Sequence, residues 1–148
     1  SAHLVQVEVD KDTGEIEVQK YIAIEDCGNV INPMVVEGQI VGGIAQGIGQ
    51  ALYEHGIYDN DGQLVSGSML DYTMPRADNF PMIDSDRIET PSPSNSLGVK
   101  GVGEMGSITS PPAVVNAVVD ALSDFGVKHI DMPLTSEKIW NIIQTNGG

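Results

Sequence analysis

The feature that most constrains this chain is a glycine-rich segment with a helical pattern. Five glycines fall within residues 38–49, after a helix-start signal at Asn32-Pro33 and before a helix end near Gly56. Each glycine inside a helix costs about 1 kcal/mol relative to alanine. A helix over residues 33–55 therefore needs a packing partner or a ligand that offsets this cost.

One face of the predicted helix is polar and open to close approach. It carries Gln39, Gly43, Gln46 and Gln50 at helical spacing. Glutamine amides donate and accept hydrogen bonds, and glycine lets a partner reach the backbone, so this face suits a flat, polar ligand. Tight helix packing through small residues is the alternative, although it would leave the amides in need of partners. The opposite face has a stripe of core residues: Ile40, Ile44 and Ile48.

A second glycine-rich segment, residues 97–106, surrounds Glu104. It is not a phosphate-binding loop, because Lys100 precedes the glycines and no hydroxyl residue follows in register. Its spacing also differs from the Rossmann fingerprint. The glycines would let the backbone bring the Glu104 carboxylate close to a ligand, and partial removal from water would make it a stronger base. We therefore predict that Glu104 is a catalytic base and that Lys100 contacts an anionic or carbonyl group; an exposed glutamate in a flexible loop is the alternative.

The remaining pattern predicts an α+β fold, with an N-terminal β-hairpin or sheet, about three helices and glycine-rich loops in a single domain over residues 1–148. Residues 4–9 and 15–19 alternate in polarity, and the second strand can continue to residue 24. Ser110-Pro111-Pro112 predicts the start of a helix over 113–125 that ends at Gly126. A third helix is predicted from Thr135-Ser136, with fraying over the last few residues. Its anchors are Ile139, Trp140, Ile142 and Ile143. Short strands are predicted at 68–73 and 87–90.

Composition narrows the functional classes. Seven basic and 21 acidic residues give a net charge of −14, which argues against a nucleic-acid backbone or an anionic membrane as partner. The single cysteine, Cys27, cannot form an internal disulfide, so we expect a reducing, cytoplasmic setting. The sequence has no signal-peptide pattern, and its most apolar stretch, residues 40–52, is too broken to span a membrane. Because the chain begins within a predicted strand, we expect a piece of a longer protein.

Other chemistry-bearing residues point to structural roles. Cys27 is expected to be a buried thiol. His3, His55 and His129 lack metal-ligand spacing, and we predict no metal-ligating side chain. Residues 59–62 form a turn rather than a calcium loop, since the distal glutamate is absent.

Several stretches together resemble a known family. They are residues 26–33, 38–49, Asp71-Tyr72 with Pro75, 93–95, 100–104, 111–118 and 133–135. In this order they resemble the molybdenum-binding large subunit of the xanthine oxidase family of molybdenum hydroxylases, most strongly the aerobic carbon monoxide dehydrogenase-like large chains. Nearly the whole chain is covered. The Gly-Gln helix together with the Gly-Val-Gly-Glu loop is a more specific signal than a lone glycine motif.

The resemblance implies a cofactor and a role for each site residue. The cofactor is molybdenum bound to a molybdopterin, expected in its cytosine dinucleotide form, with no protein side chain on the metal. The glutamate matching Glu104 takes a proton from a metal-bound, water-derived oxygen. In this family that oxygen attacks an electron-poor carbon of a small substrate, and hydride passes to the molybdenum centre. The pterin-contacting glutamine matches Gln39, and the second cofactor segment matches Lys100, Gly101, Val102 and Gly103. Gln46 joins the cofactor contacts because it shares the helix face of Gln39.

The resemblance also implies partners that this chain lacks. Electrons pass to iron–sulfur clusters on a small subunit and to FAD on a medium subunit. Family large subunits are several times longer, so the remainder of the large subunit, with its substrate loop, is a further partner. We therefore expect this chain to be inactive in isolation. A non-catalytic partner-binding module or an inactive fragment is the alternative, and carbon monoxide, purines, aldehydes and N-heterocycles all fit as substrates.

Overall fold

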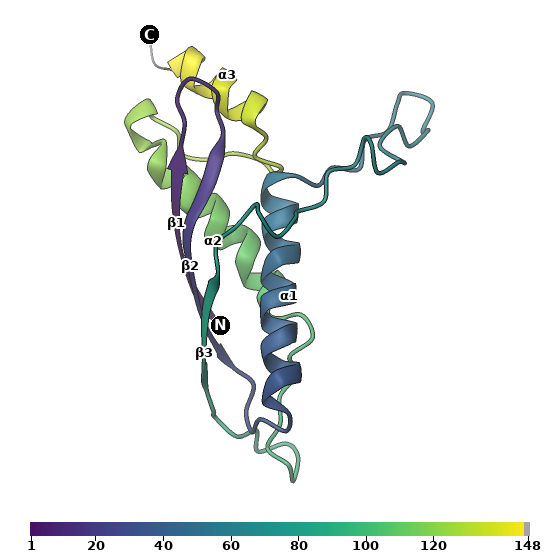
Figure 1. The fold of residues 1–148 in the computed structure, drawn as a ribbon, viewed down its shortest axis with the longest axis vertical. Helices are drawn as coiled ribbons and strands as arrows, with labels where there is room; N and C mark the ends of the chain where they lie inside the picture. The colour runs from purple at the N-terminus through teal and green to yellow at the C-terminus, as the bar shows by residue number, and fades with distance from the viewer. Residues whose placement is uncertain (147–148) are drawn as a thin grey trace.

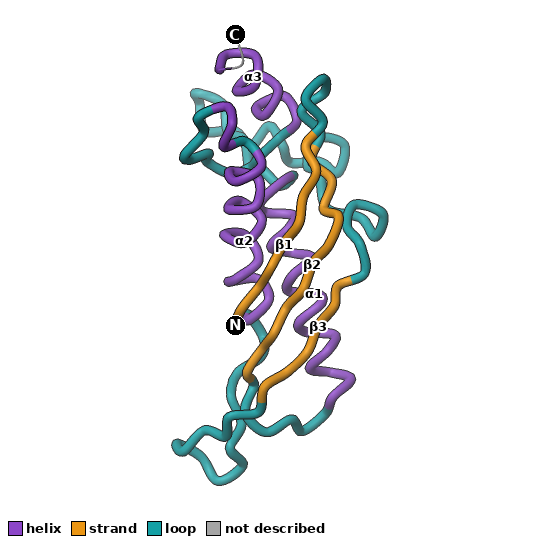
Figure 2. Tube along the Cα trace, turned by 90° about the vertical axis from the view of Figure 1, so that its left-hand side faces the viewer, coloured by secondary structure: helices purple, strands orange, loops and turns teal. Residues whose placement is uncertain are grey.

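The computed structural model, described here for residues 1–146, contains one three-stranded sheet (Figures 1 and 2). Strands β1 (Ala2–Val9) and β2 (Ile16–Asp26) form the predicted antiparallel hairpin, which turns at Gly14 with a φ of 73°. Strand β3 (Ile83–Ile88) adds to β2 in parallel and gives the order β1-β2-β3. The strand predicted at 87–90 thus lies several residues earlier, and residues 68–73 form turns rather than a strand.

Helix α1 (Pro33–Leu52) is the predicted glycine-rich helix, and it connects β2 to the segment before β3. The Asn32 side chain caps it by accepting a hydrogen bond from the Val35 backbone N–H at 3.2 Å. The helix ends at Leu52, three residues before the predicted end. The predicted core stripe of three isoleucines is confirmed, since Ile40, Ile44 and Ile48 are fully buried.

Helix α2 (Met105–Ala121) begins eight residues earlier than predicted, so Ser110-Pro111-Pro112 is not its cap. Two prolines remove two helical N–H donors, which normally ends or kinks a helix. Here tertiary packing outweighs that loss, because Pro111 is buried against the Gly47 position of α1 and Ser110 donates a hydrogen bond to the Ile44 carbonyl at 3.1 Å. A 3-10 turn, η1 (Ser123–Phe125), follows α2 and ends at Gly126, as predicted, where the backbone is left-handed.

Helix α3 (Ser136–Asn146) confirms the third predicted helix. Ile139 and Ile143 are buried anchors, but Trp140 is 41% exposed, so its assignment as a core anchor was wrong. Trp140 instead lies beside the β1–β2 turn, where a side chain at Gly14 would collide with its backbone. The fraying predicted for the last few residues falls partly on residues 147–148, which lie outside the described residues.

The helices α1 and α2 cover one face of the sheet, as Figure 2 shows, and the core lies between these layers. The segment between α1 and β3 projects as an arm away from this two-layer body (Figure 1). The predicted α+β class is therefore confirmed. No helix among residues 1–146 is long and apolar enough to cross a membrane.

Glycines bring α1 and α2 into close contact. A Cβ at Gly106 of α2 would lie 2.5 Å from the Ile40 carbonyl oxygen and 2.7 Å from the Ile44 amide nitrogen. A Cβ at Gly43 of α1 would lie 3.0 Å from the Ser107 amide nitrogen. Neither position can hold a larger residue unless the helices separate. By contrast, a Cβ at Gly42 would meet nothing within 4 Å.

This difference gives a matched pair of variants. Gly106→Ala should lower the free energy of unfolding by about 1–3 kcal/mol, since the methyl group overpacks a backbone contact. Gly42→Ala should raise it by about 0.5–1 kcal/mol, because alanine is the better helix former in open space. Urea titrations followed by circular dichroism measure both values. Equal effects of the two substitutions would contradict the close helix contact.

Candidate cofactor and catalytic site

Asp26, at the end of β2, ties three separate segments together. Its Oδ2 accepts a hydrogen bond from Lys100 Nζ at 2.6 Å. Its Oδ1 accepts from the backbone N–H groups of Gly28 at 3.0 Å and Thr90 at 3.1 Å. The Lys100 ammonium first, and then the two N–H groups, hold the pKa of Asp26 well below its usual range. We name this group the Asp26 clasp.

The clasp continues as a backbone junction between residues 26–29 and 97–100. The Lys100 amide donates to the Cys27 carbonyl at 2.9 Å, and the Asn29 amide donates to the Gly98 carbonyl at 3.0 Å. The Asn29 side chain donates to the Leu97 carbonyl at 2.7 Å. Gly28 and Gly98 have φ values of 64° and 67°, which other residues rarely adopt. Cys27 is buried here, as predicted.

Residues 101–104 span the gap between this junction and the start of α2. Among the hydrogen bonds within residues 1–146, the backbone N–H groups of these four residues donate none. A Cβ at Gly101 or Gly103 would meet nothing within 4 Å. The segment therefore presents consecutive unpaired N–H donors and an unobstructed backbone.

Glu104 occupies the N-cap position of α2, but its side chain makes no capping hydrogen bond. The carboxylate is exposed in this chain, so the partial removal from water expected for a strong base does not come from residues 1–146. Glu104 lines an open hollow of about 370 Å³. The other residues around this hollow are Ser1, Gly101, Gly103, Met105, Ile108 and Thr109. The Ser1 and Thr109 hydroxyls, which no sequence motif indicated, are its uncharged polar side chains.

Some glycines of helix α1 pack against α2, whereas others face open space. Gly43 and Gly47 face α2, which supports the packing explanation for these two positions. A Cβ at Gly38 or Gly42 would meet no atom within 4 Å, so packing within residues 1–146 does not account for them. The Gln39 and Gln46 side chains are on exposed residues of the same helix.

The contact between Gly43 and Gly106 brings the two predicted segments together, since Gly106 lies two residues after Glu104. The first half of α1 and the loop 101–104 therefore belong to one region of the molecule. The Lys100 ammonium is bound to Asp26, so this side chain stabilises the junction. Its contact with a ligand stays a prediction.

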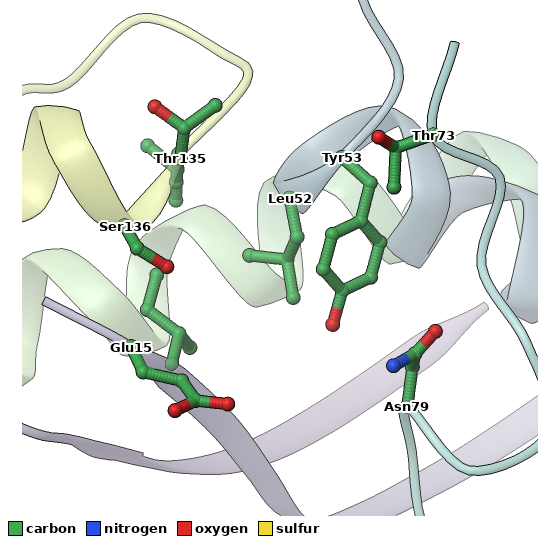
Figure 3. Close-up of a pocket in the computed structure, with 9 residues that line it drawn as sticks. Glu15, Leu52, Tyr53, Thr73, Asn79, Thr135 and Ser136 are labelled. Carbon is green, nitrogen blue, oxygen red and sulfur yellow. The ribbon is translucent and has the colours of Figure 1, made fainter. Parts of the chain in front are cut away.

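A separate cavity of about 250 Å³ lies beyond the C-terminal end of α1 (Figure 3). Leu52, Tyr53, Thr73 and Asn79 line it together with the start of α3. Burial raises the pKa of the Tyr53 phenol, which disfavours its ionised form. None of the predicted site residues lines this cavity, nor do Gly43 and Gly106.

Comparison with known proteins identifies the family. Residues 1–81 match the molybdopterin cofactor-binding domain. The chain belongs to this family. It is 50% identical over 137 residues to the nicotine 6-hydroxylase large subunit of Paenarthrobacter nicotinovorans, covering 93% of this chain and 17% of that protein. It is 40% identical over 142 residues to the carbon monoxide dehydrogenase large chain of Hydrogenophaga pseudoflava, covering 96% of this chain and 18% of that protein.

Solved structures agree with the fold. Quinoline 2-oxidoreductase from Pseudomonas putida 86 superposes with a TM-score of 0.91 at 48% identity, over 95% of this chain and 18% of that chain. A Cu,Mo-CO dehydrogenase gives the same TM-score at 35% identity, over 95% of this chain and 18% of that chain. The resemblance to molybdenum-binding large subunits is confirmed. The chain spans less than a fifth of the length of these relatives.

The Asp26 clasp predicts a specific dependence of stability on pH. Since folding lowers the pKa of Asp26, its contribution to stability is complete above about pH 4 and is lost as the pH falls below that value. Asp26→Asn should therefore destabilise the protein at pH 7, and the difference from the native protein should shrink by pH 3. Urea titrations at both pH values measure it. Asp84→Asn, an exposed position on β3, is the control, and a pH-independent Asp26→Asn effect would contradict the clasp.

Proposed function

We propose that this chain forms one wall of the molybdenum cofactor site in a molybdenum-dependent hydroxylase or dehydrogenase, with Glu104 as its catalytic base. The observation that carries the proposal is the meeting of two segments at one place. The unpaired N–H groups of residues 101–104 lie at the start of α2, and α2 contacts the glutamine-bearing helix α1 two residues later.

The donor set fits a molybdopterin cofactor. A pterin is flat and has several hydrogen-bonding groups, so it can pair with consecutive backbone amides and with glutamine side chains. The open backbone at Gly101 and Gly103 leaves room for such a ring system, as do Gly38 and Gly42 of α1. Under this proposal Gln39, Gln46 and residues 100–103 hold the cofactor. Lys100 contributes by fixing the loop through Asp26.

A bound molybdenum centre would supply the two-electron oxidation. A carboxylate oxygen of Glu104, which is the N-cap residue of α2, would accept the proton released. Covering of the hollow by the remainder of the large subunit would remove water from the carboxylate and increase its basicity.

The active unit in this proposal is larger than the chain. We propose that residues 1–148 form a single segment of the large subunit and are inactive in isolation, because Glu104 is exposed and its hollow stays open within residues 1–146. The partners proposed are the remainder of the large subunit, an iron–sulfur small subunit and an FAD-binding medium subunit. The cytosine dinucleotide form of the cofactor and a cytoplasmic location complete the proposal.

Relatives that act on nitrogen-containing aromatic rings support a substrate class. The identity to the nicotine hydroxylase subunit and to quinoline 2-oxidoreductase is 50% and 48%, against 40% and 35% for two carbon monoxide dehydrogenases. We propose an N-heterocycle as the small-molecule substrate on a carbon monoxide dehydrogenase-like scaffold. Dye-reduction assays of the assembled enzyme with quinoline, nicotine and carbon monoxide as electron donors test this choice.

The role of Glu104 is tested in the assembled enzyme. Glu104→Gln keeps the size of the side chain but removes the base, so kcat should fall by about a thousandfold. Molybdenum and pterin contents should remain those of the native enzyme, as measured by elemental analysis and pterin fluorescence. Glu89→Gln, an exposed glutamate outside the hollow, is the control. Full activity of Glu104→Gln would rule out the proposed base.

The cofactor wall is tested through Gln39. Gln39→Ala removes an amide that no packing in residues 1–146 requires, so pterin and molybdenum contents should fall while the thermal midpoint of the cofactor-free protein is unchanged. Gln63→Ala, in the projecting arm, should change neither. An assembly that never contains pterin or molybdenum would instead support the alternative of a non-catalytic, partner-binding module.

A further inference from the structure

A buried polar network lies in the sheet beneath the α2 helix and is not used by the proposed function. The side chains of His3 and Glu25 are both 0% exposed. His3 Nε2 lies 2.8 Å from Glu25 Oε1, and His3 Nδ1 lies 2.7 Å from the Tyr21 hydroxyl oxygen. The second Glu25 oxygen, Oε2, accepts a hydrogen bond from the Ser1 hydroxyl.

The order of these groups is that of a nucleophilic relay, with a carboxylate, an imidazole and a hydroxyl in line. The environment of Tyr21 excludes that chemistry. Tyr21 is fully buried, and this burial raises its pKa to about 12, with Ser110 opposing and Glu25 reinforcing the shift. An activated nucleophile needs access and a lowered pKa, and Tyr21 has neither.

The network is complete at its inner end. No buried side-chain nitrogen or oxygen among residues 1–146 lacks a hydrogen-bond partner. Tyr21 faces Ser110 of α2, and Ser110 donates to the Ile44 carbonyl of α1 at 3.1 Å. The Glu25–His3 pair, through Tyr21, therefore lies in the layer where the sheet meets α1 and α2. Removal of one partner would leave the other buried and unsatisfied, which is costly.

The outer end of the network reaches the candidate site. The Ser1 hydroxyl donates a hydrogen bond to Glu25, and Ser1 lines the same hollow as Glu104. Ile108 and Thr109 line the hollow from α2, the helix that also carries Ser110. A chain of hydrogen bonds thus joins the wall facing Glu104 to a buried carboxylate and imidazole.

We propose that Glu25 and His3 are positioning residues that hold Ser1 in the wall of the Glu104 hollow. This inference rests on the proposed role of Glu104. The pair fixes the start of β1 and, through Ser1, the position of the hollow's wall relative to Glu104. Small displacements at such a wall lower the rate of the chemical step more than they weaken substrate binding.

The test uses two variants in the assembled molybdenum enzyme. Glu25→Gln should lower kcat by about tenfold, and Ser1→Ala, which leaves the core intact, by about threefold, with KM and molybdenum content unchanged. Hydrogen exchange measured by mass spectrometry should become about tenfold faster in residues 2–6 of Glu25→Gln. The matched control is Glu54→Gln, a glutamate that likewise accepts a hydroxyl hydrogen bond, from Tyr72 at 2.5 Å, but away from the hollow.

Two results would overturn the positioning role. One is native kcat in both variants, and the other is a loss of activity in both that follows the loss of molybdenum. Glu104→Gln assayed in parallel separates the two proposals. An active Glu104→Gln enzyme contradicts the proposed function, whereas an inactive Glu104→Gln with unaffected Glu25→Gln and Ser1→Ala contradicts only this inference.

Discussion

The close approach of α1 and α2 at Gly43 and Gly106 is the contact on which the candidate site depends. Backbone meets backbone there, because a Cβ at Gly106 would lie 2.5 Å from a carbonyl oxygen of α1. Gly106 is in the first turn of α2, so the contact fixes where that helix begins. The same contact therefore fixes the position of Glu104, the N-cap residue of α2. The glycines that weaken α1 as an isolated helix are thus explained in part by packing.

The Asp26 clasp supplies the second fixed point. It joins the end of β2 to the residues after β3 and to Lys100, so residues 101–104 are anchored at both ends. A loop that is anchored at both ends can keep its own N–H groups unpaired. Under the proposed function, that arrangement would preorganise the loop for the cofactor, since little backbone ordering would remain for the ligand to induce. In the further inference, the buried Glu25–His3 pair fixes Ser1 in the wall of the Glu104 hollow in a similar way.

Sequence patterns predicted the parts of the fold that depend on local chemistry. The alternation of the hairpin, the Asn32 cap and the isoleucine stripe of α1 all depend on periodicity or capping, and the structure confirms them. The start of α2 was missed because Pro111 and Pro112 end most helices, and only packing against α1 shows why this one continues. Trp140 was misplaced because a hydrophobic side chain next to a buried stripe does not reveal which face it takes.

For the candidate site, the sequence predicted the residues but not the contacts between them. The sequence singled out Glu104, Gln39 and the two glycine-rich segments, but it could not show that one helix contact brings them together. The clasp was hidden because Asp26 and Lys100 are 74 residues apart. Lys100 therefore looked like a ligand contact, although its ammonium is bound within the protein. Long-range pairings of this kind depend on the tertiary fold and leave no local pattern.

The central claim is that the first half of α1 and residues 101–104 form one wall of the cofactor site. The most direct test is a crystal structure of the assembled large subunit with its cofactor bound. The account predicts pterin density against the N–H groups of residues 101–104 and the Gln39 amide, with the Glu104 carboxylate facing the metal. A cofactor bound away from these residues, with Glu104 directed into solvent, would contradict it.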